Sequence, residues 1–540
     1  MNRTYCVLLL TILVGGLSLV GVVPVCAESS GVIIVINSDT IWTSVDSPYN
    51  LTGPLLVEQG ATLTIDPGTT INLNGYDVQI RGTFVAVGTS IAPINITETL
   101  ETKNISPDSN PFGRLEFTSS SNGWNKQLAS GCVFDNVFIE NVDIISAVSL
   151  KISNSRIRGD LTVDDYSIIS DSYIAINNRI TNGKITIGGS SEVTNNELIG
   201  PIHFENSNTI SNNALKGSVT AGSSNTISCN NISSSVYAGS FCSILNNTIK
   251  GIVEASESTI SNNKISHTVS YYGDIFRKTT HIIDPGPAIK VSGTSRISDN
   301  IISGQEDYVG IEVNSGSFYI SANTVTDAGT AIRAQGGGTI QENLLVNNKN
   351  GIVVPSAGDL TIHDNIVVNG TVGIATHGNV VIIEKNLVSN HLTTGIDAAG
   401  SSTVIRNNTI NNNTVGIRSS ASSLTVNYNN LENNQQNSIY LENNSDEADA
   451  TNNWWGTTDT KQINMSIYDG KYAFNLDKVN FVPFLTEPNP NAKPEYTPTI
   501  PEFPVLTFLP FTIIGTFVLV LYKHKIHKLT SKGSHLCAVY

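Results

Sequence analysis

The chain has 540 residues, of which 14% are charged, and its 45 acidic against 30 basic side chains give a formal net charge of −15. Such a chain offers no basic face to a phosphate backbone, which excludes nucleic acid as a partner and suits a protein outside the cell. Sparse charge with many Asn, Ser, Thr and Gly residues also occurs in disordered chains, but the regular Ile and Val pattern described below indicates a packed core.

A secretory signal peptide is predicted at residues 1–27. Arg3 lies in a short basic front, an apolar run follows at 7–23, and Val25-Cys26-Ala27 forms a small-residue cleavage site. An uncleaved membrane anchor is the alternative interpretation. Residues 28–486 are then expected to form the exported domain.

Three cysteines lie in that domain: Cys132, Cys229 and Cys242. An odd number cannot be fully paired. Cys229 and Cys242 are 13 residues apart where the local repeat is 16 to 17, so they do not stack in register. We therefore expect buried free thiols and no disulfide framework.

A short repeat occupies about 193–265. An Ile or Val is followed three residues later by Asn, and successive copies are 16 or 17 residues apart. Its asparagines are Asn196, Asn213, Asn230, Asn247 and Asn263. These copies are predicted to be shortened coils of the solenoid inferred below, with one strand or turn trimmed.

Residues 267–286 interrupt the repeat, and an insertion in a stacked repeat maps to a loop on one face, often the binding face. Tyr271 and Tyr272 could stack on sugar rings, which makes them candidates for carbohydrate binding. Arg277, His281 and Asp284 are the catalytic candidates of this insertion. A loop that only covers the solenoid is the alternative.

A longer repeat follows at about 287–453. A small residue and Ile open each copy, and Ile-x-x-Asn-x-Ile or a close variant completes it. A fixed period of this length is the signature of stacked coils. The opening isoleucines are 20 to 22 residues apart: Ile289, Ile311, Ile332, Ile352, Ile374, Ile396, Ile417 and Ile439.

The composition of the repeat favours a parallel β-helix over a leucine-rich repeat, because β-branched residues alternate with turn formers and no 3.6-residue period is present. The repeated Asn falls where one short strand bends into the next. Asn tolerates a left-handed backbone better than other non-glycine residues, so we expect it to adopt that conformation. Its side chains are expected to stack as a ladder of hydrogen bonds.

This repeat resembles the right-handed parallel β-helix of pectin-lyase-like proteins, in the subgroup that includes NosD-type and carbohydrate-binding or sugar-hydrolase β-helices. The entry segments 60–68 (GATLTIDPG) and 82–88 (GTFVAVG) and the closing phrase 452–456 (NNWWG) support the resemblance. It implies an all-β, single-stranded right-handed parallel β-helix with coils of about 16–24 residues. The fold carries lyases, hydrolases, epimerases, adhesins and inert surface proteins, so it does not set the activity.

Residues one period apart stack about 4.8 Å apart, so outward columns follow from the sequence. Glu312 and Asp397 stand four coils apart in one column, about 19 Å, which is too far for the carboxylate pair of a glycosidase. The column also lacks the acid cluster of a pectate lyase, and polygalacturonase phrases are absent from the chain. Its alternating charges indicate a solvated ladder: Lys290, Glu312, Arg333, Val353, Ala375, Asp397, Arg418 and Tyr440.

A second column lies two residues after each motif Ile. In it Glu342 and Asp364 are neighbouring like charges and are the candidate ligands of a Ca²⁺ ion, the one cofactor considered. Neutralisation by Lys385 and solvent is the alternative. His363, His377 and His391 fall at different phases of the repeat, which argues against a copper or zinc site. The column reads Asp299, Ala322, Glu342, Asp364, Lys385, Asn407.

Trp454 and Trp455, at the end of the repeat, are candidates for a carbohydrate platform, although a cap over the last coil is favoured. Residues 487–504 contain six prolines and are predicted to form a semi-rigid linker. The apolar stretch 505–522 is long enough to span a bilayer, and the basic tail 523–540 is then cytoplasmic.

The phrase Pro501-Glu502-Phe503 resembles the C-terminal sorting signal of archaeal surface proteins, whose tail a sortase-like enzyme processes. The tail here is longer than that pattern usually allows, so a plain transmembrane anchor stays open. N-glycosylation is expected at the loop acceptors Asn50 and Asn104.

The favoured function is a membrane-anchored cell-surface protein that acts as a structural or adhesive display module. Its expected partners are extracellular polysaccharides or proteins of the surface layer or of a neighbouring cell. A polysaccharide lyase, hydrolase or epimerase that uses the insertion is the second hypothesis, so enzyme activity is left open. A NosD-like metal-delivery protein is the third.

Overall fold

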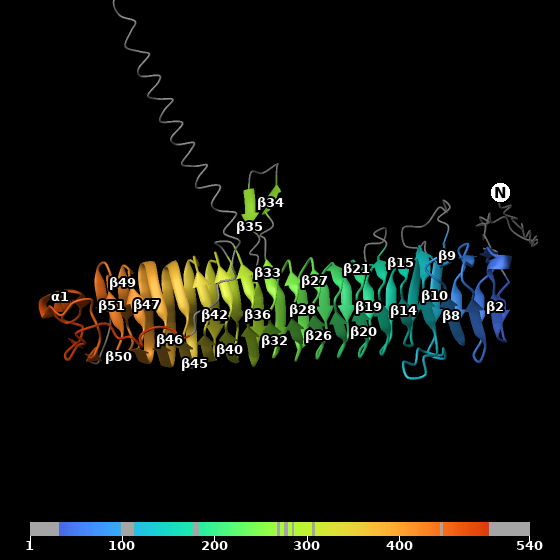
Figure 1. Cartoon of the computed structure of the whole chain (residues 1–540). Helices are drawn as coiled ribbons and strands as arrows, with labels where there is room; N and C mark the ends of the chain where they lie inside the picture. Colours follow the sequence, from blue (N-terminus) through green and yellow to red (C-terminus); the bar gives the residue numbers. More distant parts are fainter. Residues whose placement is uncertain are drawn as a thin grey trace, which may run out of the picture.

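Three short strands form each coil, and equivalent strands of successive coils pair in parallel to build three long sheets (Figure 1). In one coil, sheet 1 contains β22 (Ile202–Phe204), sheet 2 contains β23 (Thr209–Ser211) and sheet 3 contains β24 (Ala214–Lys216). The computed structural model describes residues 32–98, 113–176, 183–266, 286–304, 308–442 and 447–495, and the backbone alone of 271–274 and 279–282.

The sheets extend along the whole described rod. Sheet 1 runs from β1 (Ile34–Ile36) to β54 (Ile467–Tyr468), sheet 2 from β2 (Thr40–Trp42) to β55 (Val479–Asn480), and sheet 3 from β3 (Tyr49–Asn50) to β51 (Asn430–Glu432). The predicted all-β, right-handed parallel β-helix is confirmed. In the middle, strands continue unbroken around the corners between sheets, as in β45 (Asn350–His363), β46 (Ile366–Glu384) and β47 (Leu387–Arg406).

Coil length changes along the axis as the repeat predicts. Equivalent buried asparagines are 16 or 17 residues apart from Asn196 to Asn263, 37 apart across the insertion, and 20 to 24 apart beyond it. The short coils keep all three strands, so the alternative in which they lose a strand is wrong. They are shortened at the turns, since only two residues separate β24 from β25 (Val219–Ala221).

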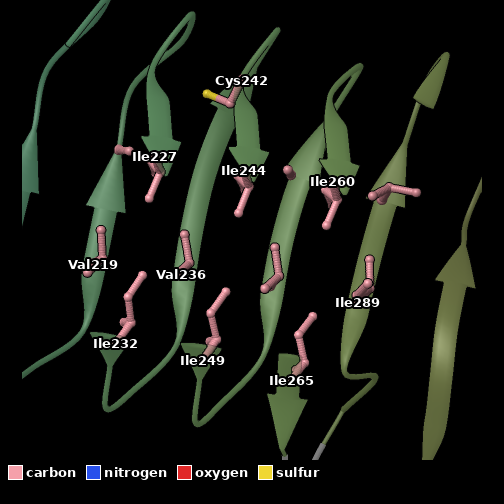
Figure 2. Close-up of a cluster of buried hydrophobic side chains, with 14 of the residues drawn as sticks. Val219, Ile227, Ile232, Val236, Cys242, Ile244, Ile249, Ile260, Ile265 and Ile289 are labelled. Atoms are coloured by element: carbon pink, nitrogen blue, oxygen red, sulfur yellow. The ribbon is translucent and has the colours of Figure 1, made fainter. Parts of the chain in front are cut away.

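The core is a stack of inward-facing aliphatic side chains, and Figure 2 shows one part of it. Ile227, Ile244 and Ile260 come from successive strands of sheet 2, and each is 0% exposed. Full burial of such a side chain contributes about 1.5–3 kcal/mol each. Because each coil covers the aliphatic layer of the next, a short coil needs a neighbour for its stability.

The predicted asparagine ladder is present at the corner between sheets 2 and 3. From Asn213 onward, each side-chain carbonyl accepts hydrogen bonds from the backbone N–H and the amide of the asparagine one coil earlier, at 2.8–3.1 Å. The ladder consists of Asn196, Asn213, Asn230, Asn247, Asn263, Asn300, Asn323, Asn343, Asn365, Asn386, Asn408, Asn429 and Asn453.

The left-handed residue of this corner is not the ladder asparagine, as the sequence had suggested, but the residue before it. Asp364 has φ 55° and Lys385 has φ 54°, and the whole second column of the sequence analysis occupies this position. The left-handed residue turns the chain while its own side chain faces outward, and the following asparagine then points into the core. Acidic residues in this column are thus explained by the turn.

The C-terminal end of the rod is closed by a cap. Trp455 is 5% exposed, and its ring meets Phe481 edge-on at 6.2 Å. The helix α1 (Thr460–Met465) adds Ile463, which is 1% exposed. Trp455 is therefore unavailable as a carbohydrate platform. Trp454 is half-buried, and its Nε1 donates to a Glu432 carboxylate oxygen at 3.2 Å.

No helix within the described ranges is long and apolar enough to cross a membrane. The predicted signal peptide at 1–27, the predicted membrane span at 505–522 and the basic tail at 523–540 all lie outside these ranges.

The three cysteines are free, as expected, but only Cys132 and Cys242 are buried. Cys229 is exposed because it occupies the outward-facing left-handed position, with φ 57°. Burial raises the pKa of the Cys132 thiol to about 11.

We expect a thiol reagent at pH 8 to label Cys229 in the folded protein and to spare Cys132 and Cys242, because thiolates react and buried thiols stay protonated. Mass spectrometry of labelled peptides before and after denaturation measures this. Equal labelling of all three sites in the folded protein would contradict the burial described here.

The predicted semi-rigid linker 487–504 begins with residues that pack on the solenoid. Residues 485–495 fold back along the outside of the rod, starting with the Leu485 N–H, which donates to the Asn453 carbonyl at 2.9 Å. Ala492 in this segment is 1% exposed. The ordered domain therefore extends beyond residue 486.

Candidate functional site

The outward column predicted on sheet 1 is confirmed residue by residue. Lys290 pairs with Glu312, Glu312 with Arg333, and Asp397 with Arg418 in the strand register. The same register continues upstream into the short coils through Thr220, Tyr237 and Glu254. One column of outward side chains thus crosses the two repeats.

The ion pairs in this column differ from those that the alternating charges suggest. The Lys290 ammonium lies 3.0 Å from a Glu254 oxygen, and Arg418 pairs with Glu442, which lies beyond the end of its strand. The hydrogen bond to Glu254 raises the pKa of Lys290, which keeps the ammonium charged. These pairs are exposed and contribute little to stability.

A cleft of about 350 Å³ lies on sheet 1 around the Glu254–Lys290 pair. Four strands form it: β25, β28 (Val236–Ser240), β31 (Val253–Ser256) and β36 (Ile289–Ser292). The register between β28 and β31 shifts between Tyr237 and Ser240, which is a bulge that opens the sheet surface at this point. We call this feature the sheet 1 cleft.

The side chains of the sheet 1 cleft suit a sugar ligand. Tyr237 is 41% exposed and offers a ring face together with a hydroxyl. Glu254 and Lys290 supply a charged acceptor and donor, and the Ser256 and Ser292 hydroxyls lie 2.8 Å apart beside them. Glu254 is the one carboxylate among the lining residues, so the cleft does not contain the two-carboxylate pair of a glycosidase.

Tyr237 and Glu254 were not singled out in the sequence, although the signal is present. Counting back 17 residues from Glu254 reaches Tyr237, and a further 17 reaches Thr220. The 36-residue step from Glu254 to Lys290, caused by the insertion, concealed that both repeats share one column.

The two candidate Ca²⁺ ligands, Glu342 and Asp364, have hydrogen-bond partners within the protein. The Glu342 carboxylate accepts from the Gln341 amide at 3.0 Å. One Asp364 oxygen lies 2.8 Å from His363 Nδ1, and the other accepts the Glu495 backbone N–H at 2.8 Å. Lys385 pairs with Glu495 and not with the column acids. Over the described ranges, no group of three or more His, Cys, Asp or Glu side chains gathers as a metal site.

The insertion forms an antiparallel hairpin, β34 (Tyr271–Asp274) and β35 (Thr279–Ile282) (Figure 1). Tyr272 pairs with His281 in its backbone register, and Tyr271 with Ile282. The candidates Arg277 and Asp284 lie outside the described residues. In the chain, the hairpin follows strand β33 (Lys264–Ser266) of sheet 3 and precedes strand β36 of sheet 1, which carries Lys290.

The histidines do not converge. His391 is 3% exposed inside the rod, His363 is bound to Asp364, and His377 is exposed on a separate corner. A NosD-like metal role therefore has no ligand set among the residues described.

Of the two expected glycosylation sites, Asn50 is exposed in β3, and its side-chain oxygen accepts from Asn72 Nδ2 at 2.6 Å. Asn104 lies outside the described residues.

A family model supports the fold. Residues 309–455 match the model described as "Right handed beta helix region". No curated protein sequence matches the chain. Among solved structures, the periplasmic alginate epimerase AlgG is similar at 11% identity and a TM-score of 0.17, over 84% of this chain and 85% of that chain.

A single-residue mutant of the same epimerase is similar at 11% identity and a TM-score of 0.18, over 76% of this chain and 83% of that chain. A likeness at this level says nothing of activity.

Proposed function

We propose that this protein is a cell-surface display rod that binds extended polysaccharide across the outer face of sheet 1. The observation that supports this proposal is the sheet 1 cleft, where Tyr237, Glu254 and Lys290 stand in consecutive coils. Coils spaced about 4.8 Å apart present these groups at a spacing that suits a polymer lying along the axis. The polar column extends the contact to Glu312 and Arg333.

Attachment to the membrane belongs to the same proposal. The apolar stretch 505–522 and the basic residues after it would hold the C-terminus, with the solenoid outside the cell. The partner would then be an extracellular polysaccharide or a glycan-bearing surface of a neighbouring cell.

The proposal predicts that Tyr237→Ala weakens polysaccharide binding by about fivefold or more, because an exposed aromatic anchor at the centre of a contact typically contributes more than about 1 kcal/mol. The measurement is the affinity of residues 28–504 for immobilised acidic and neutral polysaccharides. Lys290→Ala should weaken binding to acidic polymers more than to neutral ones, since it removes the ammonium.

Tyr319→Ala is the matched control. Tyr319 is also an outward-facing tyrosine, but it lies on sheet 2, where its ring packs at 4.5 Å from the Arg296 guanidinium. Binding should be unchanged in this variant. Equal loss of binding in both variants, or undiminished binding by Tyr237→Ala, would exclude the cleft as the site.

A polysaccharide lyase or epimerase is the second candidate, because the cleft combines the Tyr237 hydroxyl with the Lys290 ammonium and the Glu254 carboxylate. Both reactions require a base and a group that neutralises a carboxylate. Lys290 is already hydrogen-bonded to Glu254, which leaves it charged and unsuited to act as the base. Binding without turnover is therefore the favoured function.

A further inference from the structure

The segment 485–495, which we call the strap, crosses the outside of the rod one coil at a time. Asn430 holds the strap at Asn489 by two hydrogen bonds: its Oδ1 accepts the Asn489 N–H at 2.8 Å, and its Nδ2 donates to the Asn489 carbonyl at 3.0 Å. The Thr409 hydroxyl then donates to the Ala492 carbonyl. Lys385 pairs with the Glu495 carboxylate, and Asp364 accepts the Glu495 N–H.

Asn430 and Thr409 belong to one row of outward side chains on sheet 3, and Lys385 and Asp364 lie two residues before this row, at the left-handed corner. Asn430 pairs in register with Thr409, and Thr409 with Leu387. The strap thus runs from the capped end toward the middle of the rod. It ends beside the coil of Ile366, the next member of the row.

Beyond the end of the strap, three of the next four members of the row are apolar, and they are half-buried or exposed in the described structure. Ile366 pairs in register with Leu344, Leu344 with Thr324, and Thr324 with Ile301. Ile301 is 41% exposed. Val346 and Val368 are also outward-facing members of the parallel row beside it.

In the short coils, most residues at the equivalent position of this row are polar or charged. The equivalent outward residues upstream are Glu197, Ala214, Asn231, Thr248 and Lys264. Farther upstream the row again contains aromatic members, Tyr173 and the 44% exposed Phe138. The apolar cluster directly ahead of the docked segment points to a contact surface for the continuation of that segment.

We propose that residues 496–503 of this chain, which lie outside the described residues, continue the strap along this row. Tyr496, Ile500 and Phe503 would then lie against Ile366, Leu344 and Ile301. Three coil steps separate the Ile366 and Ile301 coils, about 14 Å, and eight residues reach up to about 26 Å. Lys264 follows Ile301 in the row and is exposed, which suits the acidic Glu502.

The consequence for display depends on the membrane anchor of the proposed function. The predicted membrane span begins at residue 505, two residues after Phe503. With Phe503 docked on Ile301, the rod is held by its side, and sheet 3 faces the bilayer near its middle. Sheet 1, with the proposed sugar cleft, faces a different direction.

The test uses the full chain with Cys229→Ser and Cys537→Ser and a new cysteine pair, Ile301→Cys with Phe503→Cys. Mild oxidation should form an intramolecular disulfide, identified by mass spectrometry of the linked peptides. Ile145→Cys with Phe503→Cys is the matched control, because Ile145 is likewise an outward isoleucine, 40% exposed, but on sheet 1. Lys385→Cys with Glu495→Cys is the positive control, because these two residues are paired in the structure and their disulfide shows that the strap is docked.

Efficient linking of 301 with 503, and not of 145 with 503, is the expected result. Linking of 385 with 495 alone, equal linking of 145 and 301, or a 301–503 link between two copies would overturn the proposal. Sedimentation of the protein with membranes is scored separately. A 301–503 disulfide in protein that does not sediment with membranes would support the docking and contradict the membrane anchor. Protein that sediments with membranes but forms no 301–503 disulfide would support the anchor and contradict the docking.

Discussion

Replacement of Asn386 by Ala is expected to lower the free energy of unfolding by about 3–5 kcal/mol, because several buried groups lose their partners at once. The Asn386 side-chain carbonyl accepts the Asn365 backbone N–H at 2.9 Å and the Asn365 amide at 3.0 Å. Its amide donates to the Ile362 and Glu384 carbonyls, both at 2.9 Å. Urea unfolding followed by circular dichroism measures the loss.

Asn231→Ala is the control, since Asn231 is an exposed outward residue of strand β27 (Asn231–Ile232). Its effect should stay within about 0.5 kcal/mol. Because a solenoid can open locally, hydrogen exchange should also show the damage in Asn386→Ala concentrated in the adjacent coils. Equal stability of the two variants would contradict the structural role of the ladder.

Stability is expected to fall by about 3 kcal/mol as the pH decreases from 7 to 4, through His391. Burial lowers the pKa of His391 to about 4, against an ordinary value of 6.5. The unfolded chain therefore binds a proton that the folded chain does not. The stabilisation is complete above pH 6.5 and is lost as the pH falls toward the folded pKa.

The environment of His391 explains the shift. The ring is 3% exposed, and Nε2 lies 3.1 Å from the Val367 carbonyl. Nδ1 has no hydrogen-bond partner among the described residues and lies 3.2 Å from the position that a Cβ atom on Gly370 would take. An imidazolium in this place would lack both solvent and a counter-ion.

His391→Asn tests this directly, because asparagine already occupies the equivalent position one coil later, at Asn413. The backbone N–H of His391 donates to the Asn413 side-chain oxygen at 3.0 Å. The variant should fold and should lose most of the pH dependence between 7 and 4. Burial raises the pKa of Asp160 and Asp397, but these groups titrate in both proteins and cancel in the comparison. An unchanged pH profile would exclude His391 as the cause.

The repeat itself was predictable from the sequence because each coil obeys the same steric rules. Spacing alone identified the sheet 1 column from Lys290 to Tyr440 and the asparagine ladder from Asn300 to Asn408. What periodicity could not supply was the local backbone geometry. The ladder asparagine points inward because the residue before it is left-handed, and this explains why a turn former such as Asp364 occupies that position.

The docking of the strap and the bulge that opens the sheet 1 cleft do not follow from a repeat, so periodicity did not predict them. Six prolines predict stiffness, but docking of the strap depends on Asn430 and Thr409, which lie 59 and 83 residues before the strap residues that they bind. The sheet 1 cleft arises from one bulge after Tyr237, an irregularity in a single coil. Such contacts become visible only when the coils are stacked.

The most direct test of the account is to measure turnover and binding in one sample. Residues 28–504 are incubated with acidic and neutral polysaccharides, with and without Ca²⁺, and both bound polymer and released or epimerised products are quantified. We predict saturable binding that Tyr237→Ala weakens, with no product and no dependence on Ca²⁺. Product formation that Tyr237→Ala or Lys290→Ala abolishes would contradict the display function and make the sheet 1 cleft an active site.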